Sequence, residues 1–80
     1  MNKALARHIL TQNQWSPEEI LLAERVLRHN GARRQSSILP TLMGFAATQP
    51  PSEAAAWARL LGSLQEDAQL VECLNALLAL

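Results

Sequence analysis

The segment LVECLNALLAL, residues 70–80, decides how this chain can fold, because nine of its eleven residues are apolar. If the segment forms a helix, its apolar side chains cover an arc of roughly 220° at 100° per residue. Only Glu72, Asn75 and Ala79 occupy the remaining arc. A helix that packs on one side of a small domain needs an apolar stripe of about 100°. This helix must therefore be covered on two sides.

Two arrangements provide a second cover. Either the segment is the central helix of a bundle formed by this chain, or another chain covers the exposed side. We favour the second arrangement, because eighty residues build only a small core and the segment has no basic residue to bind its last carbonyl groups. The partner is then a second copy, forming a homodimer, or another protein in a heterocomplex. The predicted partner-binding residues are Leu70, Val71, Cys73, Leu74, Leu77 and Leu78.

Charge is unevenly distributed, although the formal net charge is zero. Residues 1–40 contain six basic and three acidic residues, a net charge of +3, whereas residues 41–80 contain one basic and four acidic residues, a net charge of −3. An ordinary solvated surface accounts for this distribution. The same opposite charge of the two halves would also suit antiparallel self-association or a partner of mixed charge.

The clearest local signal is WSPEEI, residues 15–20. Ser16 and Glu19 have the spacing of a capping box, and Pro17 suits the first helical position. We expect the helix to end near His29 or Asn30, because Gly31 follows. Ile20, Leu22, Ala23, Val26 and Leu27 share its apolar side. Leu21 falls on the charged side and is a candidate contact residue.

Other helices are expected on both sides of this one. Residues 3–11 form a short first helix, and Ser36 or Ser37 caps a third, with Pro40 in its first turn and an apolar stripe of Leu39, Leu42, Met43 and Ala46. Trp57, Leu60, Leu61 and Leu64 form the stripe of a fourth helix, which breaks within residues 62–67. Leu and Ala dominate and extended β-branched runs are absent. The predicted fold is all-α, a compact bundle of four to five short helices in one domain, residues 1–80, with Leu, Val, Ile and both Trp in the core.

Residues for chemistry are sparse and scattered. The two His and the single Cys are far apart in the sequence, so neither a catalytic nucleophile with its base nor a metal site is predicted. The three Gly are too dispersed for a phosphate-binding loop, and no cofactor is predicted. We therefore expect a protein that is not an enzyme. Cys73 is expected to be a buried small apolar residue, and the absence of a signal peptide or membrane span predicts a cytoplasmic location.

Nucleic acid is the alternative partner. Arg25, Arg28, Arg33 and Arg34 lie on both sides of the Gly31 turn, in the outline of a helix-turn-helix motif. The second helix, however, carries no Arg, Lys, Asn or Gln beyond its start to read base edges, and the net charge is zero. A DNA-binding regulator is therefore the less favoured hypothesis.

The favoured hypothesis is a non-enzymatic interaction module, such as an adaptor, a chaperone-like protein or a regulatory subunit of a larger bacterial assembly. It would present an apolar helical surface to its partner. If the bundle covers the last helix unaided, the partner surface is expected around Leu21 and the arginines of residues 25–34.

Overall fold

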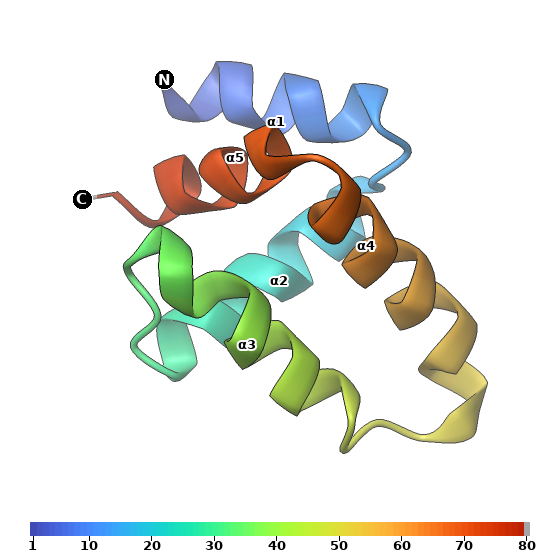
Figure 1. Ribbon diagram of the computed structural model, residues 1–80. Coiled ribbons are helices and arrows are strands. Elements are labelled where there is room, and N and C mark those ends of the chain that lie inside the picture. The colour runs from blue at the N-terminus through green and yellow to red at the C-terminus, as the bar shows by residue number, and fades with distance from the viewer. Residues whose placement is uncertain (80) are drawn as a thin grey trace.

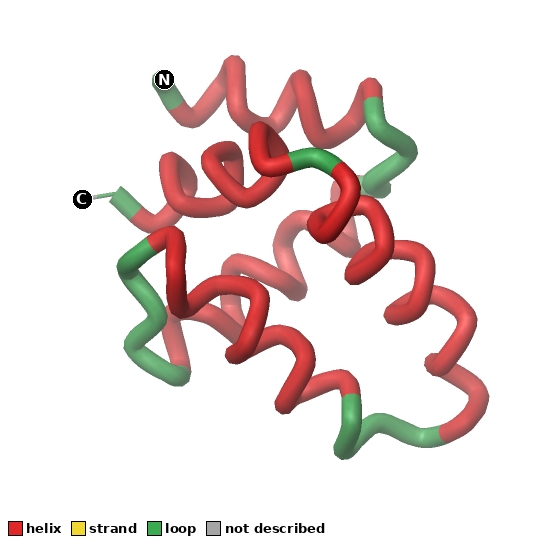
Figure 2. The backbone as a smooth tube through the Cα atoms, in the orientation of Figure 1, coloured by secondary structure: helices red, strands yellow, loops and turns green. Residues whose placement is uncertain are grey.

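The computed structural model describes residues 1–79 and consists of helices joined by short loops, with no strand in that range (Figures 1 and 2). This confirms the all-α prediction. The elements in chain order are α1 (Lys3–Gln12), α2 (Pro17–His29), α3 (Gln35–Ala46), the 3-10 turn η1 (Pro51–Glu53), α4 (Ala54–Glu66) and α5 (Ala68–Leu78). None of these helices has the length and apolarity required to cross a membrane.

Helix α5 lies at the centre of the bundle. It packs against α1, α2, α3 and α4, and Figure 1 shows it directly beneath α1 with α3 on its other side. Its side chains Leu70, Cys73, Leu74, Leu77 and Leu78 are at most 3% exposed. The chain itself therefore supplies both covers that this helix needs, which corrects our preference for a second chain. Leu80, part of the same apolar arc, lies outside the described residues.

The buried core draws side chains from all five α-helices and includes both tryptophans, Trp15 and Trp57. Most of its other members are leucines, so the prediction of an aliphatic core is confirmed. Phe45 packs edge-on against Trp57, with their ring centroids 5.4 Å apart. The radius of gyration of 11.5 Å is close to that of a folded domain of this length.

Helix α2 begins as the capping signal predicts. The Glu19 backbone N–H donates to Ser16 Oγ at 3.1 Å, and the Ser16 backbone N–H donates to Glu19 Oε1 at 2.9 Å. The helix ends at His29, and Gly31 takes the left-handed conformation with a φ of 68°. Both bounds of α2 were thus readable from local residue chemistry.

Helix α3 differs from the prediction in its start and its buried face. It begins at Gln35 with Arg34 as the N-cap residue, so Pro40 lies in the second turn. Ile38 and Leu42 are buried, whereas Met43 is 45% exposed. The apolar residues of this segment form two overlapping stripes, and packing against α2, α4 and α5 selects the one centred on Ile38 and Leu42.

The predicted break within residues 62–67 occurs at Asp67. Helix α4 continues through Gly62 and Ser63, and the Asp67 side chain then accepts a hydrogen bond from the Gln69 backbone N–H at 2.9 Å. Ser63 instead accepts a long hydrogen bond of 3.4 Å from Trp15 Nε1. A side-chain cap thus starts α5 and allows the chain to turn into the middle of the bundle.

Candidate functional site: the outer face of α2

The six partner-binding residues predicted on α5 do not form an accessible surface. Five of them lie in the core, and Val71 is partly buried against it. The large apolar side chains that the described residues do expose are those of Met1, Leu5, Leu21, Leu22 and Met43, and Leu21 and Leu22 are neighbours on α2. Leu21 is 48% exposed and Leu22 is 41% exposed.

These two leucines lie on the face of α2 that is turned away from the core. Ile20, Ala23 and Leu27 form the buried face, and at 100° per residue the opposite face carries Glu18, Leu21, Leu22 and Arg25. We call these four residues the α2 outer stripe. All four are exposed.

Leu22 was placed with the buried residues in the sequence interpretation, and this was wrong. On the helical wheel Leu22 lies beyond Val26, at the edge of the apolar arc. The neighbouring helices cover the arc only as far as Val26, which is 6% exposed. Helical periodicity alone does not show where that cover ends.

Charged residues stand at both ends of the α2 outer stripe. The ion pairs within residues 1–79 are Glu24–Arg28, at 3.1 Å, and Glu19–Arg59. Glu18 and Arg25 therefore have no ion-pair partner in this part of the chain. Glu24 and Arg28 are four residues apart, so their side chains lie next to each other on α2.

A groove lies on each side of the α2 outer stripe. The α1–α2 groove has a volume of about 310 Å³ and is lined by Arg7, Thr11, Pro17, Ile20, Leu21 and Glu24. The α2–α3 groove has a volume of about 440 Å³ and is lined by Leu22, Arg25, Val26, His29, Asn30 and Phe45. Each exposed leucine thus forms one wall of a groove. A ridge between two grooves is the relief that helices use when they pack together.

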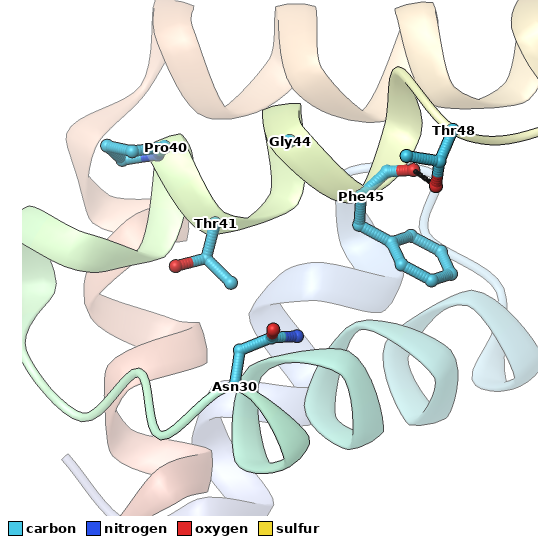
Figure 3. A pocket seen from close by; sticks show the side chains of 6 residues that line it. All are labelled: Asn30, Pro40, Thr41, Gly44, Phe45 and Thr48. Carbon is cyan, nitrogen blue, oxygen red and sulfur yellow. Dashed lines mark hydrogen bonds between the residues drawn. The ribbon is translucent and has the colours of Figure 1, made fainter.

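The α2–α3 groove continues into a hollow of about 520 Å³ along α3, with which it shares Asn30 and Phe45 (Figure 3). Thr41 and Phe45 point from α3 toward α2, and Asn30 points back toward α3. The Asn30 amide N–H donates to the Val26 carbonyl oxygen at 2.8 Å. The Thr48 hydroxyl likewise donates to the Phe45 carbonyl oxygen at 2.8 Å. The side chains of Asn30 and Thr48 therefore bind carbonyl groups in the last turns of α2 and α3.

The four arginines proposed for nucleic acid have different environments. The Arg28 guanidinium reaches across to α5 and donates to the Leu77 carbonyl oxygen at 2.8 Å. It thereby provides the cation that α5 lacks at its own end, a favourable position with respect to the helix dipole. Arg25, Arg33 and Arg34 are exposed. The exposed side of α3 beyond its first turn presents Pro40, Met43 and Gly44, which cannot read base edges.

Arg59 of α4 fixes the turn between α1 and α2. It donates to the carbonyl oxygen of Gln14, a residue with a φ of 71°, and forms the ion pair with Glu19. Burial alone would raise the pKa of Glu19, but the Ser16 backbone hydrogen bond and the Arg59 guanidinium outweigh it. The net effect is a pKa below the ordinary value. The start of α2, the helix that carries the α2 outer stripe, is thus held by the backbone amide of Ser16 and the guanidinium of Arg59, which both donate to Glu19.

Cys73 is free and buried, as expected from its apolar surroundings. Burial raises the pKa of its thiol, and the nearby carboxylates of Asp67 and Glu72 raise it further. A thiol that resists ionisation is a poor nucleophile at neutral pH. Within residues 1–79 no group of three His, Cys, Asp or Glu side chains lies close enough to hold a metal ion.

Comparison of this chain with protein-family models, with curated proteins and with solved structures gave no match.

Proposed function

We propose that this protein is a non-enzymatic protein–protein interaction module, an adaptor, chaperone-like or regulatory subunit, that binds its partner through the outer face of α2. The observation that carries this proposal is the exposure of Leu21 and Leu22 side by side, between two grooves. Fully burying one leucine side chain contributes about 1.5–3 kcal/mol, so covering the exposed halves of both offers roughly 2 kcal/mol. A reducing compartment such as the cytoplasm suits the free thiol of Cys73.

The proposal moves the partner surface from α5 to α2. A partner could bind the α5 residues only if the bundle opened, because the chain's own helices cover them. The α2 outer stripe needs no such opening. It lies on a helix whose two ends are held by a capping box and by the contact of Arg28 with α5. A surface on a rigid element loses little conformational entropy on binding.

The test is affinity capture from the native host with matched variants. The tagged wild-type protein and a Met43→Asp control should retain the same partner, because Met43 is 45% exposed but lines none of the grooves described above. Leu21→Asp combined with Leu22→Asp should lose that partner. Circular dichroism should show equal helicity for all three proteins. A partner that binds the double variant as well as the wild type would overturn the proposal.

Binding to duplex DNA is the competing hypothesis, and it predicts a different result. Affinity would fall steeply with salt and would depend on Arg33 and Arg34. We expect the fluorescence anisotropy of a labelled random-sequence duplex to change little at moderate salt. Strong binding that is lost in the Arg33→Ala plus Arg34→Ala variant would favour DNA instead.

A further inference from the structure

The α2 outer stripe has a symmetric order along the helix. Glu18, Leu21, Leu22 and Arg25 follow one another at i, i+3, i+4 and i+7, with an acid at one end, a base at the other and two leucines between them. This spacing places all four side chains within an arc of about 100° on one side of the helix. The stripe is therefore self-complementary when two copies run in opposite directions.

We infer that the partner bound by this face is a second copy of the same chain, in an antiparallel dimer. The inference rests on the proposed function and specifies its partner. A two-fold axis that passes between Leu21 and Leu22 brings Leu21 of one copy against Leu22 of the other. The same axis brings Glu18 against the second copy's Arg25, and symmetry repeats this contact. Both charges left unpaired within the described chain then find a partner of opposite sign.

The grooves support the same arrangement. Leu21 borders the α1–α2 groove and Leu22 borders the α2–α3 groove. In the antiparallel pair, Leu21 of each copy faces the wall that Leu22 and Phe45 form on the other, so the ridge of one helix meets the groove of its partner. A contact of this kind is isologous and closes after two copies, as in most homodimers.

A second copy accounts for the stripe better than a helix with one sign of charge does. A partner helix with one sign of charge would meet a like charge at Glu18 or at Arg25 and would gain at only one end. A standard interface covers about 800 Å² of each subunit, which is roughly a sixth of the 4863 Å² that this molecule exposes. The stripe and the linings of its two grooves comprise 13 residues, fewer than the roughly 20–30 on each side of a standard interface. We therefore expect a weak dimer whose population depends on protein concentration.

Charge reversal with analytical ultracentrifugation tests the inference. The wild-type protein should move from the 8.8 kDa monomer toward the dimer over about a hundredfold range of concentration. Glu18→Arg and Arg25→Glu each replace two attractive contacts by two repulsive ones, and each should raise the dissociation constant about tenfold or more at low salt. Both residues are exposed, and because Glu18 also lies in the first turn of α2, circular dichroism should first show that Glu18→Arg keeps the helicity of the wild type.

Mixing the two variants provides the decisive result. In an equimolar mixture, each arginine of the Glu18→Arg chain faces a glutamate of the Arg25→Glu chain, and a heterodimer should form with at least wild-type affinity. The matched control is a mixture of Arg33→Glu and Glu72→Arg, which carries the same changes of net charge at exposed positions outside the stripe. Each control variant should self-associate like the wild type, and mixing them should bring no comparable recovery.

Three outcomes would overturn the dimer. They are a wild-type monomer at every concentration, single variants that associate like the wild type, and a mixture that does not recover association. None of these outcomes removes the proposed function, because capture of another protein by wild type and its loss in Leu21→Asp/Leu22→Asp would still support the α2 face. Failure of that capture together with a charge-dependent dimer would leave self-association as the role of the face.

Discussion

Helices α5 and α2 use apolar residues in opposite ways. Helix α5 is the more apolar, and yet every large leucine that it presents is buried by neighbouring helices of the same chain. Helix α2 carries more charge, but two of its leucines are left in water on the face opposite the core. The apolar content of a segment therefore does not by itself identify an interface. The better indication is a pair of uncovered apolar side chains that border grooves, as Leu21 and Leu22 do, whereas the equally exposed Met43 lines none of the grooves described.

The difference follows from position in the bundle. Helix α5 has four helical neighbours, which between them surround its wide apolar arc. Helix α2 lies at the outside and receives cover on one side only, so a normal stripe of about 100° is enough for the core. Any apolar residue beyond that stripe remains available to a partner.

The largest expected effect comes from α5. Leu77 is fully buried, and Leu77→Ala should lower the free energy of unfolding by about 2–5 kcal/mol through lost burial and a residual cavity. Urea denaturation measures this loss, which should be the same at low and high protein concentration. A loss that grows as the protein is diluted would indicate that a second chain covers α5 after all.

A smaller loss is expected at the link between the two helices. Arg28→Met keeps the aliphatic stem but removes the guanidinium that binds the Leu77 carbonyl and Glu24. We expect a loss of about 1–2 kcal/mol in the free energy of unfolding, from one charged hydrogen bond and the helix-end interaction. Arg25→Met is the matched control and should leave the stability of the monomer nearly unchanged. Equal losses in both variants would contradict the assigned role of Arg28.

Features encoded within a few neighbouring residues could be predicted from the sequence. The capping box of Ser16 and Glu19, the stop at Gly31 and the cap at Asp67 all depend on short-range hydrogen bonds or backbone conformation. The all-α class likewise follows from composition and helical periodicity. These features need no knowledge of what lies across the bundle.

Features that depend on distant segments could not be predicted. Whether α5 is central, whether Leu22 is covered and which stripe of α3 is buried are each decided by packing against other helices. The cation at the end of α5 is contributed by Arg28, forty-nine residues earlier in the chain. Only Leu21 gave a local signal of the candidate site, because it lies among charged residues on the helical wheel.

Low pH should weaken the contacts of Glu19 at the start of α2, and the resulting loss in the free energy of unfolding should be smaller than that of Arg28→Met. The pKa of Glu19 is lowered in the folded state, so the unfolded chain binds more protons as the pH falls below the ordinary value of 4.5. The stabilisation is complete above that value and is lost as the pH falls through the folded-state pKa. Because the pair is partly exposed, we expect its contribution to stay below about 1 kcal/mol.

Variants at Arg59 isolate this contribution from that of other carboxylates. Arg59→Met removes the guanidinium that lowers the pKa of Glu19, and so should reduce the loss of stability between about pH 5 and pH 3. Urea denaturation at both pH values for wild type and variant gives the difference. An unchanged difference would mean that the ion pair of Arg59 with Glu19 does not contribute to acid sensitivity.

The smallest effect on stability is expected on the outer face of α2. Leu21→Ala combined with Leu22→Ala removes side chains that are 48% and 41% exposed, and alanine favours the helix slightly more than leucine does. The free energy of unfolding of the monomer, measured by urea denaturation at high dilution, should therefore change by less than about 0.5 kcal/mol per site. The same variant should weaken association of the wild-type kind, because both leucines lie at the proposed contact. A monomer that loses several kcal/mol would show that these leucines belong to the fold, and the contrast between α2 and α5 would then fail. Unchanged stability with lost association would show that Leu21 and Leu22 of α2 contribute to binding, whereas the leucines of α5 contribute to folding.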